Sequence, residues 1–286
     1  IFEGCSTVFH PAEVYMSTYN ALGVIGGKKL EASLNMREAN SSLHAGALTT
    51  AQNIVDSINK SSTVNRLVYT SSVAAMAGSM PRHPIVDESC EAAGSPNDYG
   101  PTKRLIEKFF DYAAHSSGGK WSMAIGNPVD IVGPILSPHQ ATDTWQGKIG
   151  LIIQGSSVPQ EPRGRPWMLV DVRDVAAAEI HLAESKTLRS GERYLLGAGD
   201  IISPEALGFR AMELHPDWDC ATTVAPTRGT KSVVRNDTKW LRMQIRTDKV
   251  RHKIGFEFRS FDETFKATLD ALTSVGGIKP RLRKLN

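Results

Sequence analysis

Two residues with a spacing suited to proton transfer, Tyr99 and Lys103, lie in the stretch NDYGPTKRLIEKFF at residues 97–110. Proline is tolerated only in the first turn of a helix, so Pro101 predicts a helix start close to Asp98, a good N-cap residue. The tyrosine and the lysine then share one helical face. A nearby ammonium and the positive helix end both favour a phenolate, and so lower a tyrosine pKa that is about 10 in water. The pair could act as a general acid or base, although the same spacing also arises by chance on surface helices.

Polar residues follow two apolar runs on either side of this helix. Ser71 and Ser72 end the run RLVYTSS, and Asn127 and Pro128 interrupt the run WSMAIGNPVDIVGP. In a doubly wound parallel sheet, ligands bind at the carboxyl ends of the strands, so these residues and the Tyr/Lys pair could face one crevice. The alternatives are a capping role for the serines and a plain loop at Asn-Pro.

The segments that must position these residues alternate between strand and helix. Short apolar runs predict buried strands at residues 6–12, 66–72 and 121–127, and the helical spacing of apolar residues predicts helices at 40–58 and 98–115. Strands that alternate with helices are typical of a parallel sheet. The sequence therefore predicts an α/β fold.

The order of elements is less regular after Gly133, where we place a domain boundary. A helix is predicted at residues 144–154, and PWMLVD predicts a strand before a helix at 174–184. GERYLLG predicts another strand, and Ser-Pro-Glu at residues 203–205 marks a helix start, with an N-cap, a proline at the first helical position and an acid in the first turn. A last helix is predicted at 261–273.

The composition narrows the function classes. The chain has 286 residues, 41% of them hydrophobic, and a net charge of +3, which suits a globular protein with a sizeable core. The positive charge is dispersed apart from the tail KPRLRKLN, so we do not expect nucleic-acid binding. No apolar run reaches the roughly 18 residues of a membrane span. The three cysteines form no CxxC pair and the eight histidines no HxH or HExxH pair, so we expect reduced thiols, a cytoplasmic location and no bound metal.

With these residues in place, the chain resembles an extended short-chain dehydrogenase/reductase, and within that group the dihydroflavonol reductase and cinnamoyl-CoA reductase branch. The resemblance rests on CSTVFHPA, NRLVYTSSVAAM, YGPTK, NPVDIVGPIL, LVDVRDVAAAEIHLAE and KVRHKIGFEFRSFDETFKATLDAL, which follow the family's order across nearly the whole chain. It implies a Rossmann-type doubly wound parallel sheet over residues 1–133, incomplete at the N-terminus. It also implies a smaller, mainly substrate-binding region over residues 134–286, with segments that return to the Rossmann sheet.

The resemblance also implies roles for individual residues. Ser72 matches the serine that hydrogen-bonds the reacting oxygen, and we prefer it to Ser71 because it directly precedes the small-residue segment VAA. Tyr99 matches the proton donor, and Lys103 matches the lysine that holds the nicotinamide ribose and lowers the tyrosine pKa. Residues that match the other borders of the cofactor site are His10, Pro11, Ala12, Pro128 and Val129.

Two departures from the family stand out. The family begins with a strand and a Gly-x-x-Gly-x-x-Gly turn that cradles a pyrophosphate, and nothing before residue 6 matches it, so we expect about two βα units, roughly 60 residues, to be absent. The glycine-rich GVIGGKK at residues 23–29 fits neither GxGxxG nor the P-loop, and we interpret it as a loop over the site or at the surface. Asp171 stands where family members often have histidine.

The resulting hypothesis is an NAD(P)H-dependent reductase of a ketone or aldehyde with an aromatic or other hydrophobic body. NADP is the expected cofactor, with NAD as an alternative, and we expect a monomer or homodimer. Trp145, Trp167 and the region near His139 would line the substrate pocket unless they are simply core. The same fold also serves 3β-hydroxysteroid dehydrogenases and nucleotide-sugar epimerases, for which Arg163 and Arg165 could clamp a diphosphate. A non-catalytic dinucleotide-sensing or scaffold protein is the alternative from another class.

Overall fold

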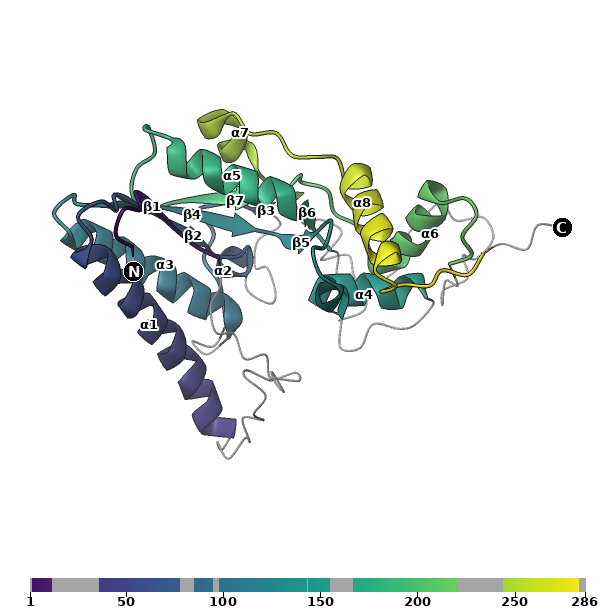
Figure 1. Cartoon of the computed structure of the whole chain (residues 1–286), viewed down its shortest axis with the longest axis horizontal. Coiled ribbons are helices and arrows are strands. Elements are labelled where there is room, and N and C mark those ends of the chain that lie inside the picture. Colours follow the sequence, from purple (N-terminus) through teal and green to yellow (C-terminus); the bar gives the residue numbers. More distant parts are fainter. Residues whose placement is uncertain are drawn as a thin grey trace. The chain divides into compact units, whose positions relative to one another are not determined.

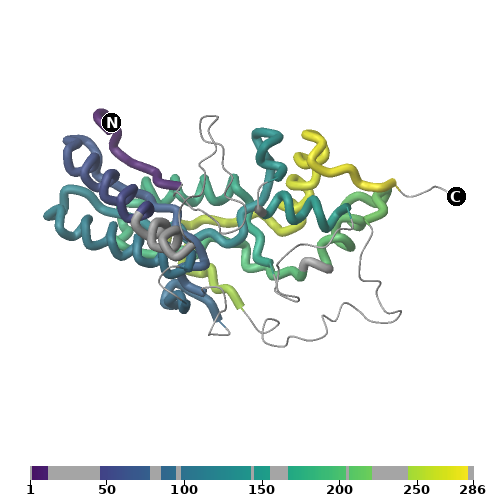
Figure 2. Tube along the Cα trace, turned by 90° about the horizontal axis from the view of Figure 1, so that it is seen from below, coloured from purple at the N-terminus to yellow at the C-terminus, as the bar shows by residue number. Residues whose placement is uncertain are grey.

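The computed structural model describes most of the chain, and Figure 2 follows its trace. The ranges described are residues 2–11, 36–77, 85–94, 98–142, 144–154, 167–220 and 244–282. The chain divides into two compact units, which we describe separately. Unit 1 comprises Ile1–Arg82, Glu88–Asn127 and Glu179–Tyr194, and unit 2 comprises His83–Asp87, Pro128–Ala178 and Leu195–Asn286.

A parallel sheet organises the first unit (Figure 1). Its strands are β1 (Thr7–His10), β2 (Arg66–Thr70), β4 (Ser122–Pro128) and β7 (Glu192–Leu196), in the order β1-β2-β4-β7. Strand β2 pairs in parallel with both β1 and β4. The predicted α/β fold with a parallel sheet is therefore confirmed.

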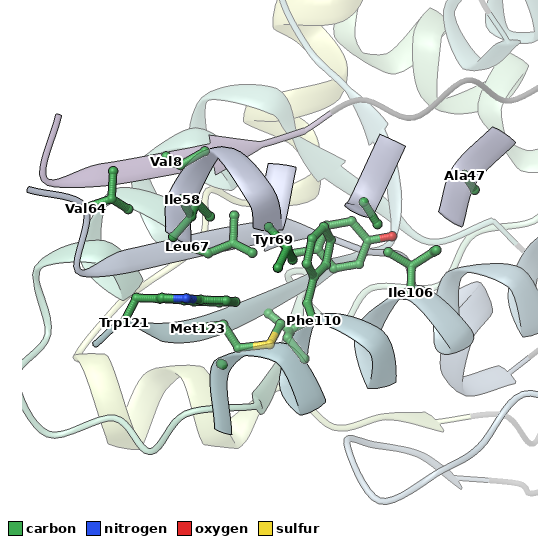
Figure 3. Packing of buried hydrophobic residues seen from close by; sticks show 14 residues of the cluster. Val8, Ala47, Ile58, Val64, Leu67, Tyr69, Ile106, Phe110, Trp121 and Met123 are labelled. Carbon is green, nitrogen blue, oxygen red and sulfur yellow. The ribbon is translucent and has the colours of Figure 1, made fainter. Parts of the chain in front are cut away.

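Two helices pack on one face of this sheet, α1 (Met36–Lys60) and α3 (Tyr99–Ser116) (Figure 1). Apolar side chains from both helices and from three strands form a single buried cluster beneath them (Figure 3). Its largest members include Ile58, Leu67, Tyr69, Phe110, Trp121 and Met123.

Alternate side chains of β2 serve opposite faces, as the pleat requires. Leu67 and Tyr69 join the cluster under α1 and α3. Arg66 and Thr70 point the other way, where they hydrogen-bond Leu182 and Glu179 near the end of α5 (Val172–Glu184). Helices thus cover both faces of the sheet, which is the doubly wound arrangement that the sequence predicts.

Helix α3 begins at Tyr99, as the proline two residues later predicts. Asp98 occupies the N-cap position with extended backbone, but its side chain makes no capping hydrogen bond, contrary to the expectation. The inward face of the helix carries Ile106, Phe110 and Ala114 at helical spacing. It also carries two charged residues that are buried, Lys103 and Glu107.

The predicted elements match the structure with small shifts at their ends. Helix α1 is longer than the predicted residues 40–58: it begins one turn earlier, at Met36, and ends two residues later, at Lys60. The strands predicted at 6–12 and 66–72 end earlier, at His10 and Thr70. The shorter second strand leaves Ser71 and Ser72 in a turn before the short helix α2 (Ala74–Ala77).

Unit 2 is built around its own buried cluster, in which the largest residues are Trp167, Trp218 and Phe265. Three helices supply half of it: α4 (Thr144–Ile153), α6 (Pro204–Leu214) and α8 (Phe261–Ser274). Strand β5 (Asp130–Val132) pairs in parallel with β6 (Leu169–Asp171). A 3-10 helix occupies Pro138–Thr142.

The capping signals of this region are confirmed, and some short elements are new. The Ser203 side chain accepts a hydrogen bond from the backbone N–H of Ala206, as the Ser-Pro-Glu pattern predicts. Helix α7 (Asp248–Ile254) and the two-residue strands β3 (Ile85–Val86) and β8 (Gln244–Ile245) were not predicted. Segments this short carry too few residues to show a period.

The core under α3 leads to a stability prediction. Phe110 is fully buried and its ring lies 5.2 Å from that of Tyr69, so Phe110→Ala should lower the free energy of unfolding by about 3–5 kcal/mol. Urea denaturation followed by circular dichroism measures this. Tyr112→Ala is the matched control, because Tyr112 lies on the same helix and is 75% exposed; it should stay within about 0.5 kcal/mol. Equal losses in the two variants would contradict the packing described.

Candidate active site

The turn after β2 presents its two serines differently. Ser71 is 4% exposed, and its hydroxyl donates to Oε1 of Glu107 at 2.5 Å. Ser72 is only half-buried; its Oγ accepts from the N–H of Ala74 at 3.1 Å, and its carbonyl oxygen accepts from Ala75. Ser72 therefore does cap a turn, as the alternative reading of the sequence had it. That contact uses a lone pair and leaves the hydroxyl proton for a ligand, which agrees with the choice of Ser72 over Ser71 as the candidate substrate contact.

The Tyr99–Lys103 pair sits where β2 ends. Tyr99 is the first residue of α3 and is 36% exposed, whereas Lys103, one turn further on, is 5% exposed. The Lys103 ammonium lies 6.0 Å from the ring centre of Tyr99 and 5.0 Å from that of Tyr69, and it donates to the carbonyl oxygen of Thr70 at 3.0 Å. A lysine on an ordinary surface helix keeps its charge in water, so the burial of Lys103 argues against that explanation of the pair.

A buried carboxyl group lies beyond the same carbonyl. The Thr70 hydroxyl donates to Glu179 of α5 at 2.6 Å. Burial raises the pKa of Glu179, while the Thr70 hydrogen bond and the positive charge of Lys103 oppose that rise. Sequence reasoning missed Glu179, because an acid in the middle of a helix carries no mark of a partner 109 positions earlier in the chain.

Asn127, at the end of β4, connects the serine turn to α3. Its side-chain amide donates to the carbonyl oxygen of Ser72 at 3.0 Å and to Oε1 of Glu107 at 2.7 Å. Both partners are acceptors, which fixes the orientation of the amide. Its Oδ1 is buried and has no hydrogen-bond partner within the part of the chain that the structure describes. An acceptor is thus left over at the carboxyl end of the sheet.

The next two residues, Pro128 and Val129, begin unit 2. The backbone N–H of Val129 donates to the carbonyl oxygen of Leu196 in β7 at 3.0 Å. A side chain at Gly197 would approach Val129 to 3.0 Å, so the glycine allows this close contact. The backbone that is predicted to border a nicotinamide is therefore held by a neighbouring strand.

The predicted cofactor border in β1 is only partly described. The His10 ring packs against Tyr69, with 5.6 Å between ring centres, and edge-on against Phe110, so its side chain belongs to the core. Pro11 is exposed, and Ala12 lies outside the described residues. The glycine-rich residues 23–29 and the arginines Arg163 and Arg165 also lie outside them.

Asp171 ends β6 in unit 2 and is almost completely buried. Burial opposes its ionisation, but hydrogen bonds and the charge of Arg173 hold its pKa below the ordinary value. The carboxylate accepts from the backbone N–H and the guanidinium of Arg173. A side chain at Gly133 would come within 3.1 Å of it. These contacts give Asp171 a role in closing the turn into α5.

The residues expected near a substrate fall into two groups. Trp167 is fully buried and lies edge-on to Trp145, with 5.1 Å between ring centres, so Trp167 belongs to the core of unit 2. His139 is exposed on the 3-10 helix. Among the described residues, no group of three or more His, Cys, Asp or Glu side chains could hold a metal ion. Nor does any helix in the described ranges have the length and apolar character needed to cross a membrane.

Comparison with known proteins identifies the family to which the chain belongs. The model of the NAD dependent epimerase/dehydratase family matches residues 33–197, more than half of the chain. A cinnamoyl-CoA reductase of Medicago truncatula (CAD2) is 27% identical over 281 residues, which cover 95% of this chain and 74% of that protein.

Solved structures show the same fold. Vestitone reductase from alfalfa (Medicago sativa) aligns with a TM-score of 0.69 at 20% identity, over 97% of this chain and 78% of that one. The yeast methylglyoxal/isovaleraldehyde reductase Gre2, complexed with NADPH, gives 0.69 at 20% identity over 96% and 78%. UDP-glucose 4-epimerase of Thermotoga maritima gives 0.65 at 17% identity over 94% and 77%.

The fold and the family expected from the motifs are thus confirmed. The matched range includes the serine turn, the Tyr99–Lys103 helix and the Asn127–Pro128 break. The chain belongs to the NAD-dependent epimerase/dehydratase family, as an extended short-chain dehydrogenase/reductase of the dihydroflavonol reductase and cinnamoyl-CoA reductase type.

Proposed function

We propose that this NAD(P)-dependent oxidoreductase uses NADPH to reduce a ketone or aldehyde with an aromatic or other hydrophobic body, and that Tyr99 is its proton donor. The observation that carries the proposal is the buried Lys103 ammonium beside Tyr99 at the carboxyl end of β2. Taking a charge out of water is costly, so a protein that keeps one there needs a use for it. Activation of a neighbouring phenol is such a use.

Each side chain has a defined part in this reaction. Tyr99 donates its phenolic proton to the substrate oxygen as negative charge develops there. The Ser72 hydroxyl donates a hydrogen bond to the same oxygen, which holds the carbonyl group in place. Lys103 favours the phenolate form and so helps Tyr99 release its proton. A bound nicotinamide supplies the hydride that the carbonyl carbon receives.

The residues present suit a nicotinamide cofactor. The Lys103 ammonium is a donor that could hold the ribose hydroxyls. The unpartnered Oδ1 of Asn127 is an acceptor for an amide N–H. Pro128 and Val129 offer backbone beside the nicotinamide, and His10, Pro11 and Ala12 are proposed to border the cofactor at the end of β1. The NADPH in the yeast reductase structure favours NADP over NAD.

In the proposed reduction, two parts of the chain bind different molecules. Residues up to about Gly133 would bind the dinucleotide, and residues 134–286 would mainly select the substrate. Trp145 lies in this second part and is partly exposed. An aromatic substrate is further supported by the cinnamoyl-CoA reductase and vestitone reductase among the similar proteins.

Epimerisation of a nucleotide sugar is the second candidate function. It is favoured by the family match and by the fold shared with UDP-glucose 4-epimerase. The two functions separate in one assay, because a reductase consumes NADPH in proportion to substrate and an epimerase does not. A non-catalytic protein is disfavoured, because it would bear the cost of burying Lys103 without using it.

Removal of the phenol tests the proton donor. Tyr99→Phe in the full-length protein should lower the rate of carbonyl-dependent NADPH oxidation by about 10²–10⁴-fold, the usual cost of losing general acid catalysis. Absorbance at the NADPH band, under saturating cofactor, measures the rate. Tyr112→Phe removes an exposed hydroxyl from the same helix and should have no effect. A Tyr99→Phe rate within about twofold of the parent, with folding intact, would falsify the assignment.

Removal of the ammonium tests the tuning of Tyr99. In oxidation of the alcohol product Tyr99 must act as a base, so kcat/KM rises with pH as the phenolate forms. Lys103→Met withdraws a positive charge, which raises the tyrosine pKa and should move this rising limb to higher pH. NADPH binding should weaken as well, because ribose contacts are lost.

The matched control for this variant is Lys108→Met on the same helix. Lys108 is 59% exposed and pairs only loosely with Glu91, at 3.6 Å. It should change neither the pH profile nor the affinity for NADPH, which calorimetry measures. If Lys103→Met leaves both unchanged, Lys103 has no part in the chemistry.

A further inference from the structure

A carboxylate that the proposed reaction does not use lies at the centre of the site. Glu107 follows Tyr99 and Lys103 at the same four-residue interval, so the three side chains form one stripe along α3. Its exposed fraction is 0%. A fully buried carboxylate is tolerated only when its oxygens are paired, so the partners of each oxygen indicate what the residue does.

Oxygen Oε1 of Glu107 holds the ends of two neighbouring strands. It accepts from the Ser71 hydroxyl at 2.5 Å and from the Asn127 amide at 2.7 Å. The same amide donates to the carbonyl oxygen of Ser72. The turn that carries Ser72 and the end of β4 are therefore both fastened to one atom of α3.

Oxygen Oε2 is balanced by two guanidinium groups. Arg104 contacts it at 2.9 Å and Arg193 at 3.0 Å. Arg193 is itself buried, and its other nitrogens donate to backbone carbonyl oxygens in neighbouring segments, namely those of Ala75, Glu88 and Cys90. The charge of Glu107 is thus compensated at Oε2, the oxygen that contacts neither Ser71 nor Asn127.

We infer that Glu107 is a positioning residue, which fixes the Ser72 turn and the Asn127 amide against the helix that carries Tyr99 and Lys103. The inference rests on the proposed function, because it concerns the geometry of the same reaction. Ser72 and Tyr99 come from segments 27 positions apart and must hold one oxygen atom together. Displacement of one by about 1 Å can cost on the order of 100-fold in rate, so a fixed tie between their segments has catalytic value.

Glu107→Gln removes the tie with little change in volume. Arg104 donates to Oε2 and Arg193 is ion-paired with it, while both polar partners donate to Oε1. A glutamine amide in either orientation therefore places its NH₂ group against a donor or a positive charge. We expect kcat to fall by about 10–100-fold per folded molecule. The rising limb of the alcohol-oxidation pH profile should not move, because Glu107 does not take up the proton. That combination separates positioning from the tuning assigned to Lys103.

The matched control is Glu91→Gln. Glu91 also pairs with Arg104, but it is half exposed and contacts neither the serine turn nor Asn127 in the described structure. It should leave kcat unchanged. If Glu107→Gln lowers thermal stability while kcat per folded molecule equals that of the control, Glu107 serves stability alone and the inference is overturned.

A second variant and a second readout keep the test decisive if Glu107→Gln does not fold. Ser71→Ala removes one hydroxyl from the tie and should also lower kcat, by less. Amide hydrogen exchange gives a readout that does not depend on activity. The backbone N–H groups of Ala74 and Ala75 donate to Ser72, so they report on the serine turn. Their exchange should be faster in Ser71→Ala and in any folded Glu107→Gln protein than in Glu91→Gln.

The outcomes distinguish the two proposals. If the parent protein reduces no carbonyl compound but amide exchange at Ala74 and Ala75 is faster in the variants, the proposed function is contradicted. Glu107 is then still the residue that holds the serine turn. If the parent is active and the variants show unchanged kcat and unchanged amide exchange, the positioning role of Glu107 is overturned and the proposed function stands.

Discussion

The parallel pairing of β2 with β4 is the constraint on which the candidate site depends. Thr70, the last residue of β2, is paired with Gly126, two residues before β4 ends at Pro128. The N–H of Ser71 donates to the carbonyl oxygen of Gly126 at 2.7 Å and extends the pairing by one step. Ser72 consequently leaves the sheet beside Asn127 of β4, close enough for the Asn127 amide to donate to its carbonyl oxygen. Tyr99 and Lys103 lie near these residues because α3 packs against this end of the sheet, where Lys103 donates to the carbonyl oxygen of Thr70.

Buried charges of both signs accumulate at this edge. Lys103 and Glu107 project from one helix, and Glu179 and Arg193 approach from segments more than 70 positions away. Each would destabilise the core if it stood alone, since an unpaired buried charge is far more costly than a paired one. Every one of them has a polar partner, however, and the Asn127 amide that donates to Glu107 also donates to the carbonyl oxygen of Ser72. The arrangement therefore exchanges part of the stability of an apolar core for fixed geometry where the strands end.

Sequence reasoning identified the part of the site that is local in the chain. The spacing of Tyr99 and Lys103, the proline between them and the apolar stripe of α3 are all properties of one helix. They predicted its start to within one residue. The strands of unit 1 and their parallel sheet followed from apolar runs that alternate with helical segments along the chain. Glu107 was overlooked even though an acid in the stripe with Ile106 and Phe110 was a visible signal. Glu179 and Arg193 had no such signal, because their partners are set by how distant segments meet.

The side chains proposed to do the chemistry all belong to unit 1, which explains why the reaction class is easier to infer than the substrate. In the proposed reaction, Tyr99 would protonate any carbonyl oxygen that Ser72 holds beside it, whatever body the molecule carries. Selection among substrates then requires contacts from residues outside this set, and the same fold accordingly serves reductases and an epimerase. A change in those outer contacts can redirect the enzyme without disturbing the stripe of α3 or its ties to the two strands. The geometry held by Glu107 would thus be common to many substrates, and what differs between relatives would lie in the residues that surround it.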